Sequence, residues 1–268
     1  MPITISHSST GRFIQCRRMY QLRKAGWKPK EDDANLIIGR AVHEGLAHWG
    51  VSKNDNEALT KALMVTVGLD ENGIDVVASL LLGYFEEYKT DVLVTICTET
   101  DVTLPITPDI NFRFKMDGVV EFEGKPWIKE SKTTGQKPGA FWSKYAMDRQ
   151  ATGYIWGARK YFDLPIEGVL VDALFKPSSK VPIPTYDRQF FSPTPTMIES
   201  WLHDIKGVGE EMLRAEASKD YWKSWTCINS WGRKCEFFDY CSNDNSLDVL
   251  RTTHDIKERL KAEAENAV

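Results

Sequence analysis

Two short stretches of the chain carry residue types that metal-assisted hydrolysis needs. Asp117 stands in one apolar run, and Glu130 and Lys132 flank Ser131 in the next. On a β-strand the side chains alternate between faces, so Glu130 and Lys132 point the same way. Hard cations such as Mg²⁺ prefer oxygen ligands, often one or two carboxylates together with substrate phosphates. Two carboxylates beside an ammonium group that orients water are the arrangement expected of a metal-dependent phosphodiesterase.

The tripeptide Glu-x-Lys is weak as a pattern, because an acid two residues before a lysine occurs five times in this chain. Context distinguishes Glu130, which follows Pro126-Trp127-Ile128 on an expected strand and has Asp117 on the preceding strand of a hairpin. On a helix, residues two apart diverge, which weakens most of the other matches. A surface ion pair at a sheet edge is the alternative, and the hairpin alone does not decide between the two.

The elements that position these residues follow from the periodicity of the sequence. From about 92 to 134, β-branched and alternating residues predict three antiparallel strands, broken at Pro105, Pro108 and Glu123-Gly124-Lys125. Further strands are expected at 168–175 and 186–191. Helical spacing predicts helices from Ser8 or Ser9 to about Leu22, then at about 35–49, 56–67, 74–89, 140–162 and 195–218, with a last charged helix closing the chain.

These elements predict a single α/β domain over residues 1–268. A helical part of about 1–91 precedes a catalytic sheet core of about 92–192, and a C-terminal helix with clustered cysteines occupies about 193–268. The hydrophobic content of 42% and the aromatic content of 11% are those of a folded protein. Neither a membrane span nor a signal peptide is evident, so we expect a cytoplasmic protein without a membrane partner.

The charge distribution is uneven. The net charge of −4 argues against a generic nucleic-acid binder. Residues 11–30 nevertheless hold seven basic residues and no acid, and residues 123–160 hold eight basic residues against three acids. Charge runs are commonly solvated helix faces, but both of these flank the candidate metal site, which favours a phosphate-binding groove. The candidate DNA contacts are Arg12, Arg17, Arg18, Lys137 and Arg149.

Two weaker patterns lie on expected helices. Gly39 precedes His43 by one helical turn, which allows the helix to approach another backbone closely. Gln150 and Tyr154 share one helix face at four-residue spacing. Taken alone, a helical histidine is more often a packed or surface residue than a ligand, and the second pair is an ordinary amphipathic helix.

Taken in order, these patterns resemble the RecB-like branch of the PD-(D/E)XK nuclease superfamily. That branch has a Ser-x-Ser helix, Cys-x-Arg-x-Tyr-like residues, Gly-x-x-x-His, an Asp-Gly strand, an acid-x-Lys-Thr strand and a Gln-x-x-x-Tyr helix. The corresponding segments here are Ser6-His7-Ser8, Cys16 to Tyr20, Gly39 to His43, Asp117-Gly118, Glu130 to Thr133 and Gln150 to Tyr154. The resemblance covers about residues 4–162 and implies the restriction-endonuclease-like core, a central mixed β-sheet flanked by helices.

The resemblance also implies roles for the individual residues. His43, Asp117 and Glu130 would be ligands of one or two Mg²⁺ or Mn²⁺ ions, with the Ser131 carbonyl as a backbone ligand. Lys132 would position the attacking water and offset charge in the transition state. The Gln150 and Tyr154 helix would steady the site and contact the DNA backbone.

The implied activity is metal-dependent hydrolysis of DNA, most consistent with an exonuclease acting on single-stranded or frayed ends in recombination, repair, or phage or CRISPR DNA processing. No Gly-x-x-x-x-Gly-Lys-Ser/Thr motif is present, so unwinding would come from a helicase or another recombination or spacer-acquisition protein. A non-catalytic DNA-binding subunit and a structure-specific endonuclease are the alternatives. The oligomeric state is left undecided.

The cysteines form a separate pattern. The chain has five, and clustered cysteines in a cytosolic protein favour metal or redox chemistry over disulfides. Cys227, Cys235 and Cys241 lie in an irregular, aromatic-rich stretch that needs something to fold around. Ordinary buried or free thiols are the alternative. Cys97 has no partner in the pattern and is expected in the core.

Some RecB-like nucleases, among them CRISPR-associated RecB-like exonucleases and AddB-type nucleases, hold a [4Fe–4S] cluster on one N-terminal and three C-terminal cysteines. The resemblance therefore implies Cys16, Cys227, Cys235 and Cys241 as ligands that tether an N- and C-terminal helical lobe. The interval from Cys227 to Cys235 is longer than that family has, so Cys227 is the least certain ligand. Thiolates suit Zn²⁺ equally well, and spacing does not separate zinc from a cubane cluster.

Overall fold

The computed structural model describes residues 2–143, 145–225, 227–228, 232 and 234–256. These residues divide into two compact units. Unit 1 consists of Met1–Asp32, Ile106–Asn111 and Asp204–Val268, and unit 2 consists of Asp33–Pro105 and Phe112–His203. Each unit is described by itself, and the expectation of a single domain stays a prediction.

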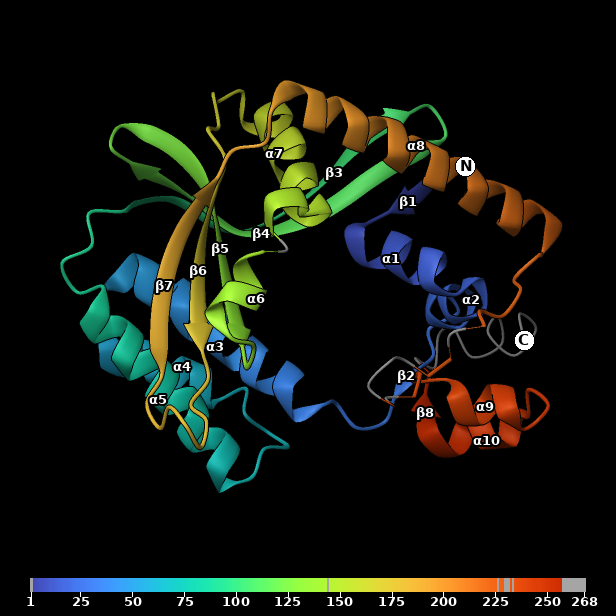
Figure 1. Ribbon diagram of the computed structural model, residues 1–268, viewed down its shortest axis with the longest axis horizontal. Coiled ribbons are helices and arrows are strands. Elements are labelled where there is room, and N and C mark those ends of the chain that lie inside the picture. The colour runs from blue at the N-terminus through green and yellow to red at the C-terminus, as the bar shows by residue number, and fades with distance from the viewer. Residues whose placement is uncertain (1, 144, 226, 229–231, 233, 257–268) are drawn as a thin grey trace. The chain divides into compact units, whose positions relative to one another are not determined.

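A mixed β-sheet organises unit 2 (Figure 1). β4 pairs antiparallel with β5, β5 pairs parallel with β6, and β6 pairs antiparallel with β7. β3 also pairs with β4. This confirms the predicted mixed sheet flanked by helices. The strand bounds are Val94–Thr107 for β3, Ile110–Phe122 for β4, Lys125–Thr134 for β5, Val169–Phe175 for β6 and Thr185–Phe191 for β7.

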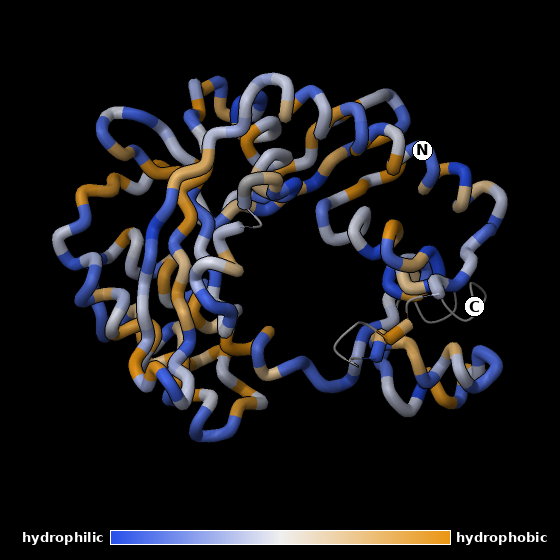
Figure 2. The backbone as a smooth tube through the Cα atoms, viewed as in Figure 1, coloured by the Kyte–Doolittle hydropathy of each residue, from blue (hydrophilic) through white to orange (hydrophobic). Residues whose placement is uncertain are grey.

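The residues of each strand explain its place in the sheet. β6 is buried at every position and reads as a nearly continuous apolar run, as expected for a strand with a parallel neighbour and both faces covered, and it contrasts with the more hydrophilic β7 in Figure 2. The turn from β4 to β5 uses Glu123 and Gly124, both at positive φ, as a two-residue hairpin turn requires. β3 continues through Pro105, so the strand break predicted there was wrong.

The helices of unit 2 begin at side-chain caps. Asp33, Asn54, Asp70 and Asp148 each accept a backbone N–H at the start of a helix. Asp148 also divides the helix predicted at 140–162 into separate pieces. The bounds are Ala34–Ser52 for α3, Asp55–Leu63 for α4, Glu71–Glu87 for α5, Pro138–Trp142 for α6, the 3₁₀ turn Tyr145–Met147 and Arg149–Phe162 for α7.

The helices α3, α4 and α5 pack together over one face of β6. Their shared core contains Trp49 of α3, Leu81 and Phe85 of α5, and Leu174 of β6. The Trp49 and Phe85 rings stack with their centroids 5.2 Å apart. This apolar cluster fixes α3 against the sheet, and α3 is the helix that carries His43.

Unit 1 joins the two ends of the described chain. The structure corrects the first expected helix, because Cys16 is extended at φ −164° and ψ 117° and separates two helices. Ser6, not Ser8 or Ser9, is the cap of the first one. The elements are β1 (Ile3–Ile5), α1 (His7–Gln15), α2 (Arg17–Lys24), β2 (Lys28–Pro29), α8 (Pro195–Ser218, which starts in unit 2), α9 (Phe238–Ser242), α10 (Leu247–Thr253) and β8 (His254–Asp255).

N-terminal and C-terminal segments share one hydrophobic cluster in unit 1. Leu22 and Trp27 pack with Phe237, Tyr240 and Leu250, and β2 pairs antiparallel with β8. The last charged helix of the sequence analysis falls largely beyond residue 256 and lies outside the described residues. Among the described helices, none combines the length and apolar character that crossing a membrane demands.

Candidate active site

The hairpin of β4 and β5 brings the predicted carboxylates together. Gly118 pairs with Lys129 in the antiparallel register, which sets Asp117 beside Glu130 on the neighbouring strand. The Lys132 ammonium donates to Glu130 Oε1, as alternation along one strand predicts. The two acids and the lysine therefore form one cluster on the sheet.

Gly118 explains why aspartate is followed by glycine. A Cβ atom built at position 118 would lie 2.6 Å from the Cys97 carbonyl oxygen of β3. Because a backbone atom cannot move aside cheaply, only glycine allows β3 to lie this close to β4 next to Asp117. The Asp-Gly pair thus combines a functional carboxylate with a packing requirement.

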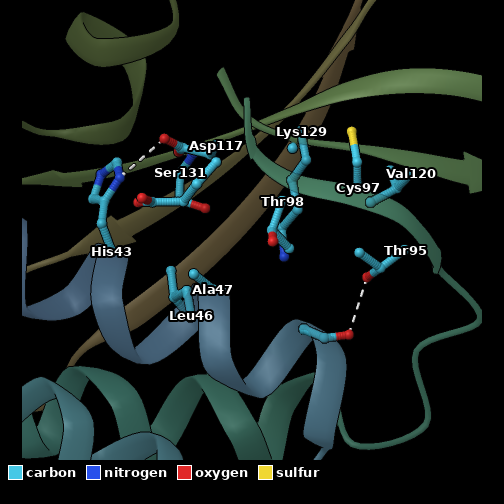
Figure 3. Close-up of a pocket in the computed structure, with 13 residues that line it drawn as sticks. His43, Leu46, Ala47, Thr95, Cys97, Thr98, Asp117, Val120, Lys129 and Ser131 are labelled. Atoms are coloured by element: carbon cyan, nitrogen blue, oxygen red, sulfur yellow. Dashed lines mark hydrogen bonds and ion pairs between the residues drawn. The ribbon is translucent and has the colours of Figure 1, made fainter. Parts of the chain in front are cut away.

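His43 of α3 reaches the same aspartate. Its Nδ1 atom lies 3.1 Å from Asp117 Oδ1, and the two side chains point toward each other in Figure 3. Asp117 Oδ2 accepts the Ser131 backbone N–H at 2.7 Å. Gly39 meets only an ordinary contact with Thr133 Oγ1 at 3.6 Å, so the close approach of backbones expected there was wrong. The tight glycine of α3 is Gly45, whose Cβ would meet Leu81 at 2.7 Å.

Burial and charge set the ionisation of Asp117 and His43. Burial opposes the charged form of Asp117, but the attraction and hydrogen bond of His43 and the Ser131 amide outweigh it, and the pKa of Asp117 is lowered. Burial likewise opposes the charged form of His43, and Asp117 outweighs it, so the pKa of His43 is raised. Asp117 is therefore a stable carboxylate at neutral pH.

Glu130 is in the opposite situation. Burial and the neighbouring Asp117 charge raise the pKa of Glu130 to about 7. Its Oε2 atom is buried and has no hydrogen-bond partner among the described residues. The pKa of Lys132 is raised, because Glu130 and Asp117 outweigh its burial, and the lysine stays charged. Two crowded carboxylates and one unshared buried oxygen are a donor set that a divalent cation would satisfy.

A small cavity of about 30 Å³ opens beside these residues (Figure 3). His43, Asp117 and Ser131 line it together with Cys97 and Glu99 of β3. The volume suits one or two water-sized occupants and excludes a nucleotide. Over the described residues, no set of three or more His, Cys, Asp and Glu side chains is already close enough to enclose a metal ion.

Three further side chains belong to this neighbourhood. Gln150 Nε2 donates to the Tyr154 hydroxyl at 2.7 Å on α7, and the predicted pair therefore forms. Burial and the Glu130 charge raise the pKa of Tyr154 to about 12. Tyr145 is buried and lies close enough to Lys132 and Glu130 for their charges to affect its pKa. Tyr145 was not predicted as a site residue, because the sequence pattern places it inside a continuous helix.

Some of the predicted DNA-contact residues already form ion pairs or hydrogen bonds within the protein. Arg17 is paired with Glu211 at 3.1 Å, and its guanidinium lies over the rings of Phe13 and Trp222. Arg18 donates to Gln21 Oε1 at 2.7 Å. These two arginines serve contacts inside unit 1.

The remaining three predicted contacts lie on different parts of the chain. Lys137 caps α6 and is exposed, and Arg149 is the exposed first residue of α7. Arg12 lies on α1 and lines a cavity of unit 1. The basic run at 11–30 lies in unit 1, and the basic run at 123–160 lies in unit 2.

The four tail and N-terminal cysteines gather within unit 1. The Cys235 amide donates to the Cys227 carbonyl at 2.8 Å, and the Ser224 amide donates to Cys16 Sγ at 3.4 Å. All four are partly buried free thiols, and Cys16, Cys235 and Cys241 pack on the unit 1 hydrophobic cluster.

Burial raises the pKa of the Cys235 and Cys241 thiols, and the neighbouring Cys16 and Cys227 raise both pKa values further. A bound metal would favour the thiolate form of these two residues. Cys97, expected in the core, is only partly buried and lines the cavity beside Asp117.

A mixed sheet with helices on it, carrying two carboxylates and a lysine on neighbouring strands, defines the class of restriction-endonuclease-like phosphodiester hydrolases. The family model of the PD-(D/E)XK nuclease superfamily matches residues 4–242, and the chain belongs to this superfamily. Its members are nucleases that generally use divalent metals.

One solved structure is similar in fold. The crystal structure of an Eubacterium rectale protein named "Putative exonuclease" is similar with a TM-score of 0.56 and 14% identity, over 91% of this chain and 89% of that chain. A second structure, SSO0001, has a TM-score of 0.34 and 14% identity over 75% of this chain and 74% of that chain, and it carries no argument. No curated protein sequence matches.

Proposed function

We propose that the protein is an Mg²⁺- or Mn²⁺-dependent deoxyribonuclease of the RecB-like branch, acting as an exonuclease on single-stranded or frayed DNA ends. The observation that carries the proposal is Glu130, a buried carboxylate that stands against Asp117 with one oxygen unshared. A buried charge of this kind costs stability unless a ligand compensates it. The structurally similar Eubacterium rectale protein carries the name "Putative exonuclease", which agrees with the proposed mode of attack.

His43, Asp117, Glu130 and the Ser131 carbonyl would hold the divalent ion. When bound, the ion polarises the phosphoryl oxygen, lowers the pKa of bound water and stabilises the leaving oxygen. Asp117 stays ionised because His43 and the Ser131 amide fix its two oxygens. Metal binding would require the neutral form of His43, and with Nδ1–H donating to Asp117 the Nε2 atom would then be the lone-pair donor.

Lys132 acts through its permanent charge. Because its pKa is raised, it is a poor base, and it serves instead to orient water and to offset negative charge on the transition state. Gln150 holds the Tyr154 hydroxyl, and this pair would steady the site and contact the DNA backbone.

Cleavage of end-labelled single-stranded DNA with Mn²⁺ tests the activity. We expect the Lys132→Met and Asp117→Asn variants to lose cleavage while unfolding at the temperature of the wild type. Lys125→Met, at the exposed start of the same strand as Lys132, should retain the fold and most of the activity. Undiminished cleavage by either active-site variant would contradict the proposal.

Circular single-stranded DNA separates the two modes of attack. An exonuclease leaves the circle intact and degrades the same DNA after linearisation. Cleavage of the circle at a comparable rate would instead identify an endonuclease, and binding without any cleavage would identify a DNA-binding subunit. Unwinding of longer duplexes would then require a helicase or a recombination or spacer-acquisition partner.

We further propose that Cys16, Cys227, Cys235 and Cys241 hold a [4Fe–4S] cluster that fastens the N- and C-terminal segments of unit 1. The support is the packing of Cys16, Cys235 and Cys241 on one hydrophobic cluster and the backbone hydrogen bond that joins Cys235 to Cys227. Tetrathiolate coordination suits zinc as well, so the metal has to be measured.

Anaerobic purification followed by iron, sulfide and zinc analysis decides between the metals. We expect a brown protein with absorbance near roughly 400 nm, lost in Cys16→Ser and Cys241→Ser. Cys97→Ser is the matched control and should retain colour, because Cys97 lies on β3 of unit 2. A colourless protein with stoichiometric zinc would replace iron by zinc, and a metal-free protein would end this proposal.

A further inference from the structure

A larger cavity lies within unit 1, and its lining residues are not those of the candidate active site. It has a volume of about 530 Å³, in the range of ordinary ligand pockets. Its lining includes Ser9, Arg12, Tyr20, Arg23, Lys24 and Glu216. The short strand β1 contributes an apolar part of the wall through Ile3.

The polar side of this cavity is dominated by positive charge. Arg12, Arg23 and Lys24 face a single acid, Glu216. That acid is already engaged, because it pairs with Lys24 and accepts the Tyr20 hydroxyl at 2.7 Å. The cavity is therefore cationic even with its own carboxylate ionised.

Among the three cations that line this cavity, Arg12 has the least compensation by nearby negative charge. Its electrostatic neighbours are Arg23, which repels it, and Glu236, which attracts it. Glu236 is committed to Arg23 through contacts of 2.9 and 3.0 Å. Among the described residues, Arg12 forms no ion pair with a carboxylate. Burial and the Arg23 charge accordingly lower the pKa of Arg12.

We propose that this cavity binds a phosphate group of the DNA strand, with Arg12 as its principal contact. The inference rests on the proposed nuclease function and adds an anchoring site in the other unit to it. A guanidinium binds phosphate oxygens through paired, charge-assisted hydrogen bonds, and Lys24 adds a second cation. The Tyr20 ring and Ile3 offer an apolar surface to the attached nucleoside.

Binding of a fluorescein-labelled single-stranded oligothymidylate, measured by anisotropy in EDTA, tests the assignment without cleavage. Arg12→Gln should weaken binding about tenfold, as loss of one charge-assisted phosphate contact does. It should also make the slope of log affinity against log salt shallower by about 0.7, the value for one phosphate of a single strand. The matched control is Arg214→Gln, an exposed residue paired with Glu211, which should change neither quantity.

Glu216→Gln provides a test of opposite sign in the same cavity. Glutamine keeps an acceptor for Tyr20 but removes the negative charge and frees Lys24, so binding should become tighter. Misfolding cannot strengthen binding, and thermal unfolding of each variant confirms the fold. Unchanged binding by Arg12→Gln, or an equal loss in Arg214→Gln, would overturn the proposal.

The position of the phosphate is distinguished by three probes of one length, carrying a 5′-phosphate, a 3′-phosphate or neither. A preference for one phosphorylated end that disappears in Arg12→Gln assigns the cavity to that terminal monoester. Equal binding of all three, still weakened by Arg12→Gln, assigns it to an internal phosphodiester. If the wild type binds but does not cut with Mn²⁺, the nuclease proposal fails alone; if it cuts but Arg12→Gln binds normally, the cavity proposal fails alone.

Discussion

Glu130 and Asp172 are buried carboxylates on neighbouring strands of unit 2, and they differ in how far their charge is compensated. Glu130 of β5 aligns with Val171 of β6, so Asp172, the next residue along, points to the opposite face of the sheet. Glu130 is 6% exposed and Asp172 is 1% exposed. Burial is therefore similar, and the difference lies in the partners.

Asp172 is fully compensated. Arg188 of β7 holds both of its oxygens, the Tyr84 hydroxyl donates to Oδ2, and the Lys129 ammonium lies 3.7 Å from Oδ2. Arg188 also pairs with Asp91 at 2.9 Å. Glu130, by contrast, has Lys132 on one oxygen, Asp117 as a repelling neighbour, and nothing described on the other oxygen.

The comparison shows that one sheet carries a carboxylate that stabilises the fold and, on the neighbouring strand, a carboxylate suited to bind a cation. Around Asp172, charge is neutralised internally and ties the strands and α5 together. Around Glu130, one carboxylate oxygen is left without a partner, as a site that must receive a cation requires. The following predictions test this contrast, from the largest expected effect to the smallest.

The Glu130→Gln variant should lower Mn²⁺-dependent DNA cleavage by about three orders of magnitude or more, because it removes a charged ligand from the reaction centre. Its free energy of unfolding in EDTA should not fall, since glutamine keeps an acceptor for Lys132 and removes a buried carboxylate whose raised pKa shows that its charged form is unfavourable. Rates on end-labelled DNA and urea unfolding measure the two quantities. Glu121→Gln, on an exposed position of β4, is the control. A large loss of stability in Glu130→Gln would erase the contrast with Asp172.

The Arg188→Met variant should lose about 3–5 kcal/mol of unfolding free energy, because it leaves the buried Asp172 charge unpaired. Urea unfolding provides the measurement. The matched control is Arg113→Met, which breaks the exposed Arg113–Asp101 pair on strands β4 and β3 and should cost about 0–1 kcal/mol. Adding Asp172→Asn to Arg188→Met should restore part of the loss, and equal costs for the buried and exposed pairs would contradict the interpretation.

Gly118→Ala should destabilise unit 2 by about 1–3 kcal/mol and reduce cleavage, because its Cβ would lie 2.6 Å from the Cys97 carbonyl oxygen and would displace β3 beside Asp117. Gly39→Ala is the matched control, since its Cβ would make an ordinary 3.6 Å contact. Alanine in a helix interior should there be neutral or slightly stabilising. Thermal unfolding and cleavage rates of the two variants check the difference, and a tolerated Gly118→Ala would show that β3 is free to shift.

His254 extends the comparison to unit 1, because its Nε2 atom is another buried atom without a hydrogen-bond partner among the described residues. Burial and the Arg23 charge lower the pKa of His254 to about 4. Between the ordinary value near 6.5 and about 4, the unfolded chain binds more protons, so stability falls as pH falls through this window and is fully present above it.

Urea unfolding between pH 7.5 and pH 4 measures this dependence, as the difference between the wild type and His254→Asn. We expect the variant to have the flatter profile in that window. His203→Asn, at an exposed position, should retain the profile of the wild type. Parallel profiles for the wild type and His254→Asn would show that the histidine is protonated in the folded protein.

Much of unit 2 was predictable because its signals are local. Alternation along β4, the apolar run of β6 and the Glu123-Gly124 turn each follow from a few neighbouring residues. The adjacency of Asp117 and Glu130 follows from the hairpin, and the side shared by Glu130 and Lys132 follows from the two-residue period of a strand.

Other features escaped sequence reasoning because they depend on distant residues. The helix break at Cys16 depends on the packing of unit 1. The position of Tyr145 depends on Asp148, which starts a new helix inside the segment that was expected to be one continuous helix. Asp172 left one visible signal, an acid inside an otherwise apolar strand, but its partners Tyr84 and Arg188 come from a helix and a strand far along the chain.

The sequence by itself determined the strands of the hairpin and the pair of acids with their lysine, because these depend on residue type and on the short period of a strand. The order of the motifs along the chain added the family and, through the resemblance, its mixed sheet. Only the tertiary structure decided that Glu130 keeps an unshared oxygen while Asp172 keeps none, and that Arg12 lines a cationic cavity. The reason is physical: the burial of a side chain, the compensation of its charge and the shape of a cavity depend on which distant side chains pack around it. A local sequence pattern contains no information about those distant residues.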